Sequence, residues 1–463
     1  MLLPMSPADA IFLLGETREH PMHVGGLVLL QPADGSDAWD LRGMLDAAMA
    51  RGEVAPKLRR RARRSVTSLG QWGWEADVDV DLGHHVRHSA LPQPGGMAEL
   101  MDLVSRLHAG LLDRSRPLWE MHLIEGLADG RLAVYTKIHH ALADGVSAMR
   151  MLRGALSPDP DVRGMPAPWE PIDGASRSTA VDDGANPVGK AAGAAMRTFG
   201  GVMGEVAGMV PALVGTVDRA LHERGGALSL AAPRSMFNVP IGGARRFAAR
   251  SWPLERLRLV AKHADATLND VVLAMCAGAL RGYLDELDEL PAESLVAMVP
   301  VSLRGERQEG KSGNEIGLLT CSLATDRVDP VERLAAIGES MRQGKDSMRT
   351  RTSSQILAMS ALGAAPLAMG MMLGRGGPIR PANVMISNVP GPATPLYWNG
   401  ARMTALYPLS IPVHGQALNI TCTSTDDEIA FGLTGCRRSV PALAPLLGHL
   451  DDELVGLEEA FGL

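Results

Sequence analysis

The chain of 463 residues is poor in aromatic side chains, which make up 4% of it although hydrophobic residues make up 46%. Its apolar surfaces are therefore mainly aliphatic, and 25 methionines add flexible, polarisable contacts. Ordinary core filling explains most of these methionines. At about 150 residues per domain, the length allows two or three domains and a large core.

Positive charge and cysteine are also scarce. The net charge of −7 gives no general basic surface, so we expect no nucleic-acid partner. The four cysteines, at positions 276, 321, 422 and 436, form neither a close-spaced metal pattern nor a disulfide framework. A reducing cytoplasm is the simplest location for such a chain.

A clear secretory or membrane-crossing segment is missing. The first residues lack a basic region followed by a long apolar run, so they make a poor signal peptide. Residues 352–374 match the span of about 20 residues that a bilayer requires, but polar residues and Pro366 interrupt them. We expect a buried or membrane-contacting helix pair broken near Pro366. Residues 186–221 either lie on a membrane as an amphipathic helix or pack across the domains.

Three common catalytic fingerprints are absent: GxGxxG, the P-loop and the GxSxG nucleophile elbow. We therefore expect no cofactor and no serine nucleophile. Predicted strands and helices recur in both halves of the chain, which favours two α/β domains. The Pro-, Gly-, Ser- and Asp-rich residues 157–183 predict a linker. We predict an N-terminal domain at 1–156, a linker and crossover helix at 157–240, and a C-terminal domain at 241–463.

The strongest chemical pattern is Lys-Ile-His-His-Ala-Leu-Ala-Asp-Gly at residues 137–145. Residues 131–138 predict a strand and 146–152 a helix, with Asp144 and Gly145 ending the turn between them. An imidazole in such a turn titrates near working pH and can take a proton from a hydroxyl. A single histidine or an Asp-Gly turn is more often structural, but the combination favours catalysis.

A second pattern precedes the predicted apolar helix at 271–287. Thr267 and Asp270 have the spacing of a capping box, in which Thr267 caps the helix and Asp270 reaches back to its first donors. For Asp270, this structural role and a functional role are equally favoured. The amide of Asn269 is expected at the entrance of the helix.

Residues 139–145 resemble the HHxxxDG signature of the CoA-dependent acyltransferase superfamily. More narrowly, the chain resembles the bacterial wax ester synthase/acyl-CoA:diacylglycerol acyltransferase family, and within it the actinobacterial triacylglycerol synthases. The resemblance runs from the first residues to the last eighty, with a divergent middle. Further matching stretches are PMHVG at 21–25, PLWE at 117–120, ND at 269–270, PVSLR at 300–304 and SNVPGP at 387–392.

The resemblance implies two chloramphenicol-acetyltransferase-like domains joined by a linker, with the active-site channel between them. It implies long-chain acyl-CoA as donor, diacylglycerol as acceptor and triacylglycerol as product. Long-chain alcohols are a further class of acceptor, which would give wax esters. The expected location is cytoplasmic, at the inner face of the membrane or on lipid droplets.

The resemblance also assigns roles to individual residues. His140 is the expected general base for direct attack by the acceptor hydroxyl on the thioester. His139 and Gly145 support the turn, Gly145 by supplying backbone freedom. Asp144 is expected to be mainly structural, paired with Arg304 of the other domain. The oxyanion donor stays open: the positioning and oxyanion candidates are Asn269, Asp270 and Ser424.

Three other functions stay open at this stage. One is an acyltransferase with another acceptor or a carrier-bound donor, which the lack of a carrier-protein domain weakly disfavours. A second is a non-catalytic lipid-binding or droplet-coating protein, whose lipid binding would not depend on His140. A third is a metal hydrolase, but adjacent histidines lack the i, i+4 spacing of HExxH sites, so we expect no metal.

Overall fold

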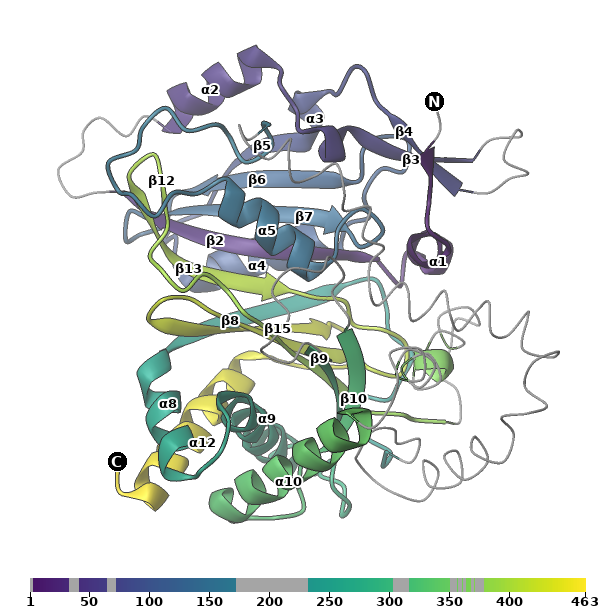
Figure 1. Ribbon diagram of the computed structural model, residues 1–463, viewed down its shortest axis with the longest axis vertical. Helices are drawn as coiled ribbons and strands as arrows, with labels where there is room; N and C mark the ends of the chain where they lie inside the picture. The colour runs from purple at the N-terminus through teal and green to yellow at the C-terminus, as the bar shows by residue number, and fades with distance from the viewer. Residues whose placement is uncertain are drawn as a thin grey trace.

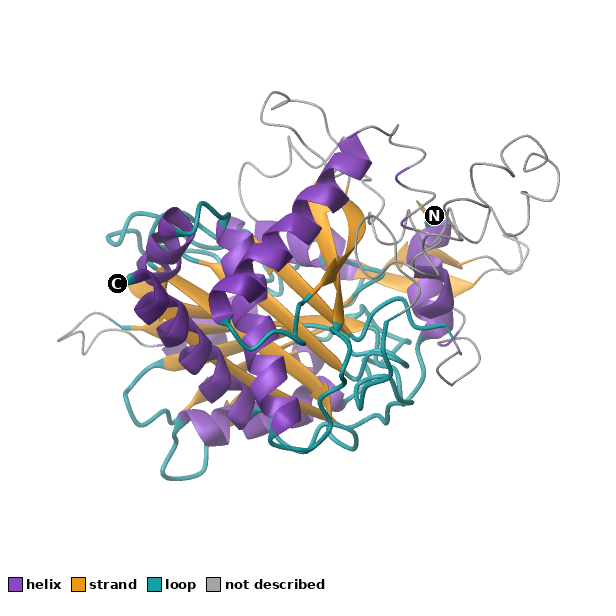
Figure 2. Ribbon diagram, turned by 90° about the horizontal axis from the view of Figure 1, so that it is seen from below, coloured by secondary structure: helices purple, strands orange, loops and turns teal. Residues whose placement is uncertain are grey.

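Two six-stranded sheets form the centre of the molecule, and a small three-stranded sheet lies beside the N-terminus (Figure 1). The computed structural model describes residues 3–32, 41–64, 72–171, 232–302, 316–349 and 379–463, together with 356, 360, 364–367 and 370. Helices are layered over the strands (Figure 2). The predicted α/β class is therefore confirmed.

The first sheet has the order β12-β13-β2-β7-β6-β5. Its pairs are antiparallel except for β5 with β6. Its strands are β2 (His23–Gln31), β5 (Val86–Ala90), β6 (Trp119–Glu125), β7 (Leu132–His139), β12 (Tyr397–Trp398) and β13 (Ala401–Leu409).

The helices of this half lie around the first sheet, and α5 crosses one of its faces (Figure 1). They are α1 (Pro7–Gly15), α2 (Leu41–Arg51), the 3-10 turn Pro56–Arg59, α3 (Leu82–His85), α4 (Met97–Ala109) and α5 (Gly145–Gly154). Ser6 caps α1 by accepting from the Asp9 N–H. The small sheet contains β1 (Leu3–Pro4), β3 (Arg60–Arg64) and β4 (Trp72–Ala76).

The second sheet has the order β10-β9-β11-β14-β15-β8, and helices cover its side away from the first sheet (Figure 1). Its strands are β8 (Arg245–Pro253), β9 (Val296–Ser302), β10 (Ile316–Ser322), β11 (Val384–Val389), β14 (Leu418–Ser424) and β15 (Glu428–Cys436). The helices are α8 (Leu254–His263), α9 (Leu268–Asp285), α10 (Pro330–Arg349) and α12 (Ala444–Phe461).

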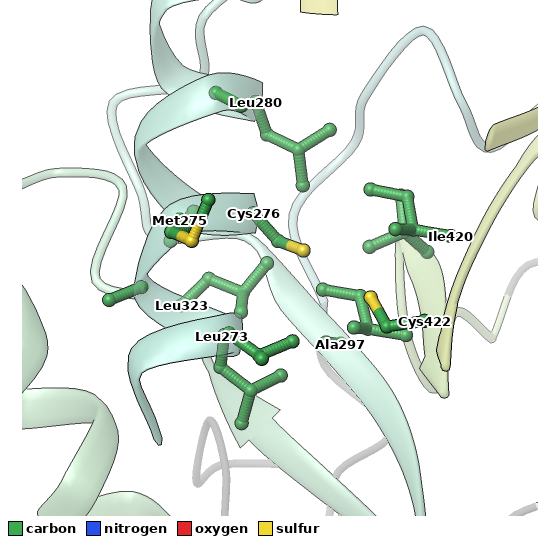
Figure 3. Close-up of a cluster of buried hydrophobic side chains, with 14 of the residues drawn as sticks. Leu273, Met275, Cys276, Leu280, Ala297, Leu323, Ile420 and Cys422 are labelled. Carbon is green, nitrogen blue, oxygen red and sulfur yellow. The ribbon is translucent and has the colours of Figure 1, made fainter. Parts of the chain in front are cut away.

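Helix α9 is the centre of the larger core. Its sequence is almost free of charge between Val271 and Leu280, and both faces of that stretch are buried. Cys276 of α9 and Cys422 of β14 lie on facing sides of this cluster (Figure 3). Burial raises the pKa of the Cys422 thiol well above its ordinary value, as does its neighbour Cys276. The two cysteines therefore act as small apolar side chains.

The order of the chain does not follow the order of the sheets. Strands β12 and β13 belong to the range predicted as the C-terminal domain, yet β13 pairs with β2 along seven residue pairs from Arg402↔Gln31 to Leu409↔Gly25. The late part of the chain thus completes the first sheet and then returns to the second as β14. This crossing holds the two halves together.

No helix among the described residues is both long and apolar enough to cross a membrane. Of the predicted helix pair at 352–374, Ile356 and Ser360 are described as helical and buried. Ser360 Oγ accepts a hydrogen bond of 3.0 Å from the Leu318 N–H of β10, so this part packs on the second sheet. The predicted membrane or crossover helix at 186–221 lies outside the described residues, as do residues 172–183 of the predicted linker.

Candidate active site

Alternation along β7 separates two chemical environments. Thr136 and Ile138 line a cavity on one face of the strand, and His140, directly after the strand, lines the same cavity. Lys137 points to the other face, where its ammonium donates to the Leu107 and Gly110 carbonyls of the α4 end. The His140 N–H donates to the Met22 carbonyl of the neighbouring segment at 2.8 Å, which fixes the turn against β2.

The cavity has a volume of about 260 Å³ and lies between the two sheets. Apolar groups cover most of its wall, and four methionines contribute: Met121, Met149, Met151 and Met385. Its lining comes from β2, β6, β7, β13 and α5 on one side and from β9, β11 and β14 on the other. A flexible apolar ligand fits such a wall, with a few polar groups to orient it.

His140 is a titratable residue that lines this cavity, and its pKa is shifted. Burial lowers the pKa of His140 to about 4; Asp144 opposes this shift and His139 adds to it. The ring stacks on Phe12 of α1, with centroids 4.1 Å apart and planes 17° apart. At neutral pH the imidazole is therefore uncharged, which is the state that accepts a proton.

Asp144 caps the helix that follows the turn. Its Oδ1 accepts from the Ser147 N–H at 2.8 Å, at the first turn of α5. This is the structural role that an aspartate takes at an N-cap. The carboxylate also lines the cavity and interacts with His140. Its predicted partner, Arg304, lies outside the described residues.

His139 belongs to a buried polar cluster behind the turn. Its Nδ1 accepts from the Ala141 N–H at 3.1 Å, and its Nε2 lies 3.4 Å from Glu16 Oε1. Glu16 also accepts from the Met22 N–H and from Arg114. Burial would raise the pKa of Glu16, but these three partners outweigh it and hold the pKa below its ordinary value. The cluster ties the turn to α1, as a supporting role for His139 requires.

Gly145 is exposed at the start of α5 and lines the cavity. Its φ is not in the left-handed region, and an added Cβ would meet no atom within 4 Å. The predicted need for backbone freedom at Gly145 is therefore wrong for this conformation. The space next to its Cα is open and belongs to the cavity wall.

Asn269 and Asp270 lie in the first turn of α9. The predicted capping box is confirmed: Asp270 Oδ2 accepts from the Thr267 N–H and hydroxyl, and the Asp270 N–H donates to Thr267 Oγ1. As the structure describes the cavity, neither Asn269 nor Asp270 is part of its lining.

Ser424 ends β14, a strand whose two faces differ. Thr421 and Thr423 line the cavity, whereas Cys422 packs into the core on the helix side. Alternation gives Ser424 the parity of Cys422 and directs it away from the cavity. Two lining hydroxyls have internal acceptors: Thr421 donates to Asn419 Oδ1 and Thr423 to the Val389 carbonyl. Ser387 of β11 lines the cavity from the same side.

Several residues at the site were not predicted from the sequence. Phe12 and Glu16 contact the histidine pair from a segment more than a hundred residues away, and Arg114 binds Glu16. No motif spacing marks these three residues. Ser387 lies in the SNVPGP stretch that supported the family resemblance, so the sequence did contain a signal for this residue.

Among the described residues, no group of three or more His, Cys, Asp or Glu side chains is arranged to hold a metal ion.

Comparison with protein families gives two matches that together span most of the chain. Residues 5–272 match the wax ester synthase/diacylglycerol acyltransferase catalytic domain, and residues 312–458 match the C-terminal domain of the same family. A Mycobacterium tuberculosis protein named as a candidate diacylglycerol O-acyltransferase is 55% identical over 99% of this chain and 92% of its own length.

Solved structures agree with this result. The wax ester synthase/diacylglycerol acyltransferase of Marinobacter aquaeolei is similar over 100% of both chains, with 39% identity and a TM-score of 0.81. The starter condensation domain of rhizomide synthetase covers 100% of this chain and 95% of its own, with 13% identity and a TM-score of 0.56. At that identity the second likeness shows the fold alone, and together the two structures confirm the predicted two-domain α/β fold.

Proposed function

Since the chain belongs to the wax ester synthase/diacylglycerol acyltransferase family, we propose that it transfers a long-chain acyl group from acyl-CoA to diacylglycerol, with His140 as general base. Membership makes the chain an O-acyltransferase. The observation that carries the assignment of the base is the position of His140, a neutral imidazole that lines an apolar cavity.

The reaction needs one base and no covalent enzyme intermediate. His140 takes the proton of the acceptor hydroxyl, whose oxygen attacks the thioester carbonyl. The C–O ester bond forms, the C–S bond breaks, and the proton passes from His140 to the CoA thiolate. The Asp144 charge stabilises the imidazolium that exists between these transfers, since it favours the protonated ring.

Hydroxyls that line the cavity are the best candidates for the oxyanion donor. Thr136 of β7 and Ser387 of β11 approach it from the two sheets. Neither Asn269 nor Ser424 lines the cavity as the structure describes it, which weighs against a direct contact of either side chain with the oxyanion. We propose that they support α9 and β14, and that a donor from Thr136 or Ser387 contributes to stabilising the tetrahedral intermediate.

The acceptor is insoluble in water, so we propose that the enzyme works at a lipid surface, the inner face of the membrane or a lipid droplet. Leu14 of α1 is 57% exposed and Leu3 is 47% exposed, near the helix that contacts His140. Strand β3, in the same small sheet as Leu3, adds four arginines, of which Arg61 and Arg63 pair with Glu75. Such a surface combines apolar and cationic groups, as binding to anionic lipid requires. Long-chain alcohols that reach the same cavity would yield wax esters.

Replacement of His140 tests this assignment. Purified His140→Ala should lose at least about 100-fold in acyl transfer, the lower end of what a positioned base contributes, while its melting temperature stays close to that of the parent protein. Labelled palmitoyl-CoA with diacylglycerol and long-chain alcohols, followed by separation of lipid classes, measures both activity and acceptor. Near-normal turnover by this variant would exclude His140 as the base.

The pH dependence of acyl transfer is a second test of the role of His140. Because the pKa of His140 is about 4, the free enzyme holds a neutral imidazole at all higher pH values. We expect kcat/KM to be flat from neutral pH down to about 5 and to fall only as pH approaches 4. A fall centred near the ordinary histidine pKa would contradict the burial of this ring.

A further inference from the structure

The cavity follows strand β2 away from His140. Val24, Gly26 and Val28 alternate onto the cavity face and all line it. The register places Ile138 opposite Val24 and Thr136 opposite Gly26, so the strands supply successive rows of side chains. The Met22 carbonyl accepts from the His140 N–H, which puts the catalytic residue at the first row.

The far end of this path is closed. Beyond Val28, the next cavity-face residue of β2 is Leu30, which pairs with Leu132. Both leucines are buried in the hydrophobic core of the first half and neither lines the cavity. Leu406 of β13 pairs with Val28 and closes the same row from the side.

Gly26 lies midway along the path and has no side chain. Its neighbours in the row are Pro408 on β13 and Thr136 on β7. A Cβ built at Gly26 would have Leu406 Cδ1, at 3.9 Å, as its nearest neighbour, so the space above it is open. Gly25 also borders the cavity, through its backbone, but a Cβ added there would point to the opposite face, 3.0 Å from Tyr135 Cε2 and 3.2 Å from the Thr136 carbonyl. Gly25 thus meets a packing limit, whereas Gly26 faces free volume.

We propose that this row of positions is the binding site for the acyl chain of the thioester and that Gly26 determines which chain lengths pass. The inference rests on the proposed function, because it places the thioester carbonyl at His140. A polar glycerol or pantetheine group is a poor occupant of the deep part, whose walls are Val28 and Leu406.

The strand register gives an estimate of the length of acyl chain that the path holds. A strand advances about 3.4 Å per residue, so Gly26 lies about 14 Å and Val28 about 20 Å from the Met22 row. Carbon–carbon bonds of about 1.5 Å give an extended chain an advance of about 1.25 Å per carbon. The path therefore reaches Gly26 after about 11 carbons and ends at Val28 after about 16. Palmitoyl is the chain that this site fits.

Side chains added at Gly26 test the proposal. Gly26→Val and Gly26→Leu should block the path beyond the middle, and kcat/KM with palmitoyl-CoA should fall tenfold or more, the effect of about 1.4 kcal/mol of overpacking. Octanoyl-CoA ends before this row, so its kcat/KM should stay within about twofold of the parent value. Gly26→Ala, which adds one methyl, should lie between parent and Gly26→Val. Each enzyme is assayed with the same diacylglycerol and a series from octanoyl- to stearoyl-CoA.

A matched control and a second variant separate the outcomes. Gly456→Leu adds the same side chain on α12, where a Cβ also meets no atom within 4 Å, and should leave the length profile unchanged. Val28→Ala opens the closed end and should raise the rate with stearoyl-CoA relative to palmitoyl-CoA. The melting temperature of each variant establishes that it is folded.

The possible results are distinct. A parent enzyme inactive with every acyl-CoA would contradict the proposed function itself. An active parent whose Gly26 variants lose equally at all chain lengths, or at none, would overturn the assignment of the chain site. So would a loss that depends on the chain length of the acceptor, measured with short- and long-chain diacylglycerols, because the acceptor would then occupy the path.

Discussion

Asp144 combines a structural and an electrostatic role in one carboxylate. Its Oδ1 caps α5 through the Ser147 N–H, and its charge favours protonation of His140. The first role needs only an acceptor oxygen, whereas the second needs a negative charge. Two substitutions at this residue can therefore separate stability from catalysis.

We expect Asp144→Ala to lose stability and activity together, and Asp144→Asn to lose activity with little change in stability. Removing the cap costs about 1 kcal/mol, and asparagine replaces aspartate well at an N-cap. Urea unfolding and acyl transfer, measured on both variants, check this expectation. Equal destabilisation by the two substitutions would show that the charge, and not the cap, holds the turn.

His139 and His140 are adjacent in sequence, yet their surroundings differ. His139 is fully buried against Glu16, and its Nδ1 is used by the Ala141 N–H. His140 stacks on Phe12 and reaches the cavity. The pair therefore contains one residue that holds the turn and one that is placed to react, as the family resemblance implied.

At the scale of elements, the turn after β11 connects the two halves near the site. Arg153 of α5 donates to the Gly391 carbonyl of this turn. A Cβ at Gly391 would overlap the Ser424 carbonyl at the end of β14 and would contact Thr423 Oγ1. Gly391 is thus required by the close approach of two backbones, which explains the glycine of the Pro-Gly-Pro stretch.

We expect Gly391→Ala to destabilise the protein by about 1–3 kcal/mol, the typical cost of forced overpacking. Thr423 and α5 border the cavity, so acyl transfer should fall as well. Gly448→Ala on α12 is the matched control: its Cβ meets no atom within 4 Å, and alanine in a helix stabilises by up to about 1 kcal/mol. Chemical denaturation of both variants measures the difference. Opposite signs are expected, and a neutral Gly391→Ala would contradict the close approach.

At the scale of the whole molecule, β13 makes the two halves dependent on each other. It pairs with β2 and supplies Tyr407 and Leu409 to the core beneath the first sheet. Without it, β2 would be an exposed edge with unpaired backbone groups. The first sheet is therefore incomplete until the last quarter of the chain has been made.

We expect residues 1–240, expressed alone, to aggregate or to lack a cooperative thermal transition. Coexpression with residues 241–463 should restore a soluble complex, because that fragment brings β13. Size-exclusion chromatography and circular dichroism on both preparations test this dependence. A soluble, cooperatively folding fragment 1–240 would show that the first sheet is stable without β13.

Local sequence rules determined the parts of this protein that depend on neighbours in the chain. The strand and turn around 139–145 and the capping box of Thr267 and Asp270 were predicted because alternation and capping act within a few residues. The choice of His140 rather than His139 came from the family resemblance, and its contacts now give that choice a physical basis.

Tertiary structure alone decided the features that join distant segments. Phe12 and Glu16 meet the histidine pair, β13 enters the first sheet, and Thr421 rather than Ser424 faces the cavity. The open space above Gly26 also depends on neighbours from two other strands. Such contacts are set by strand register and by the packing of two sheets, and no spacing within a single stretch of sequence encodes either one.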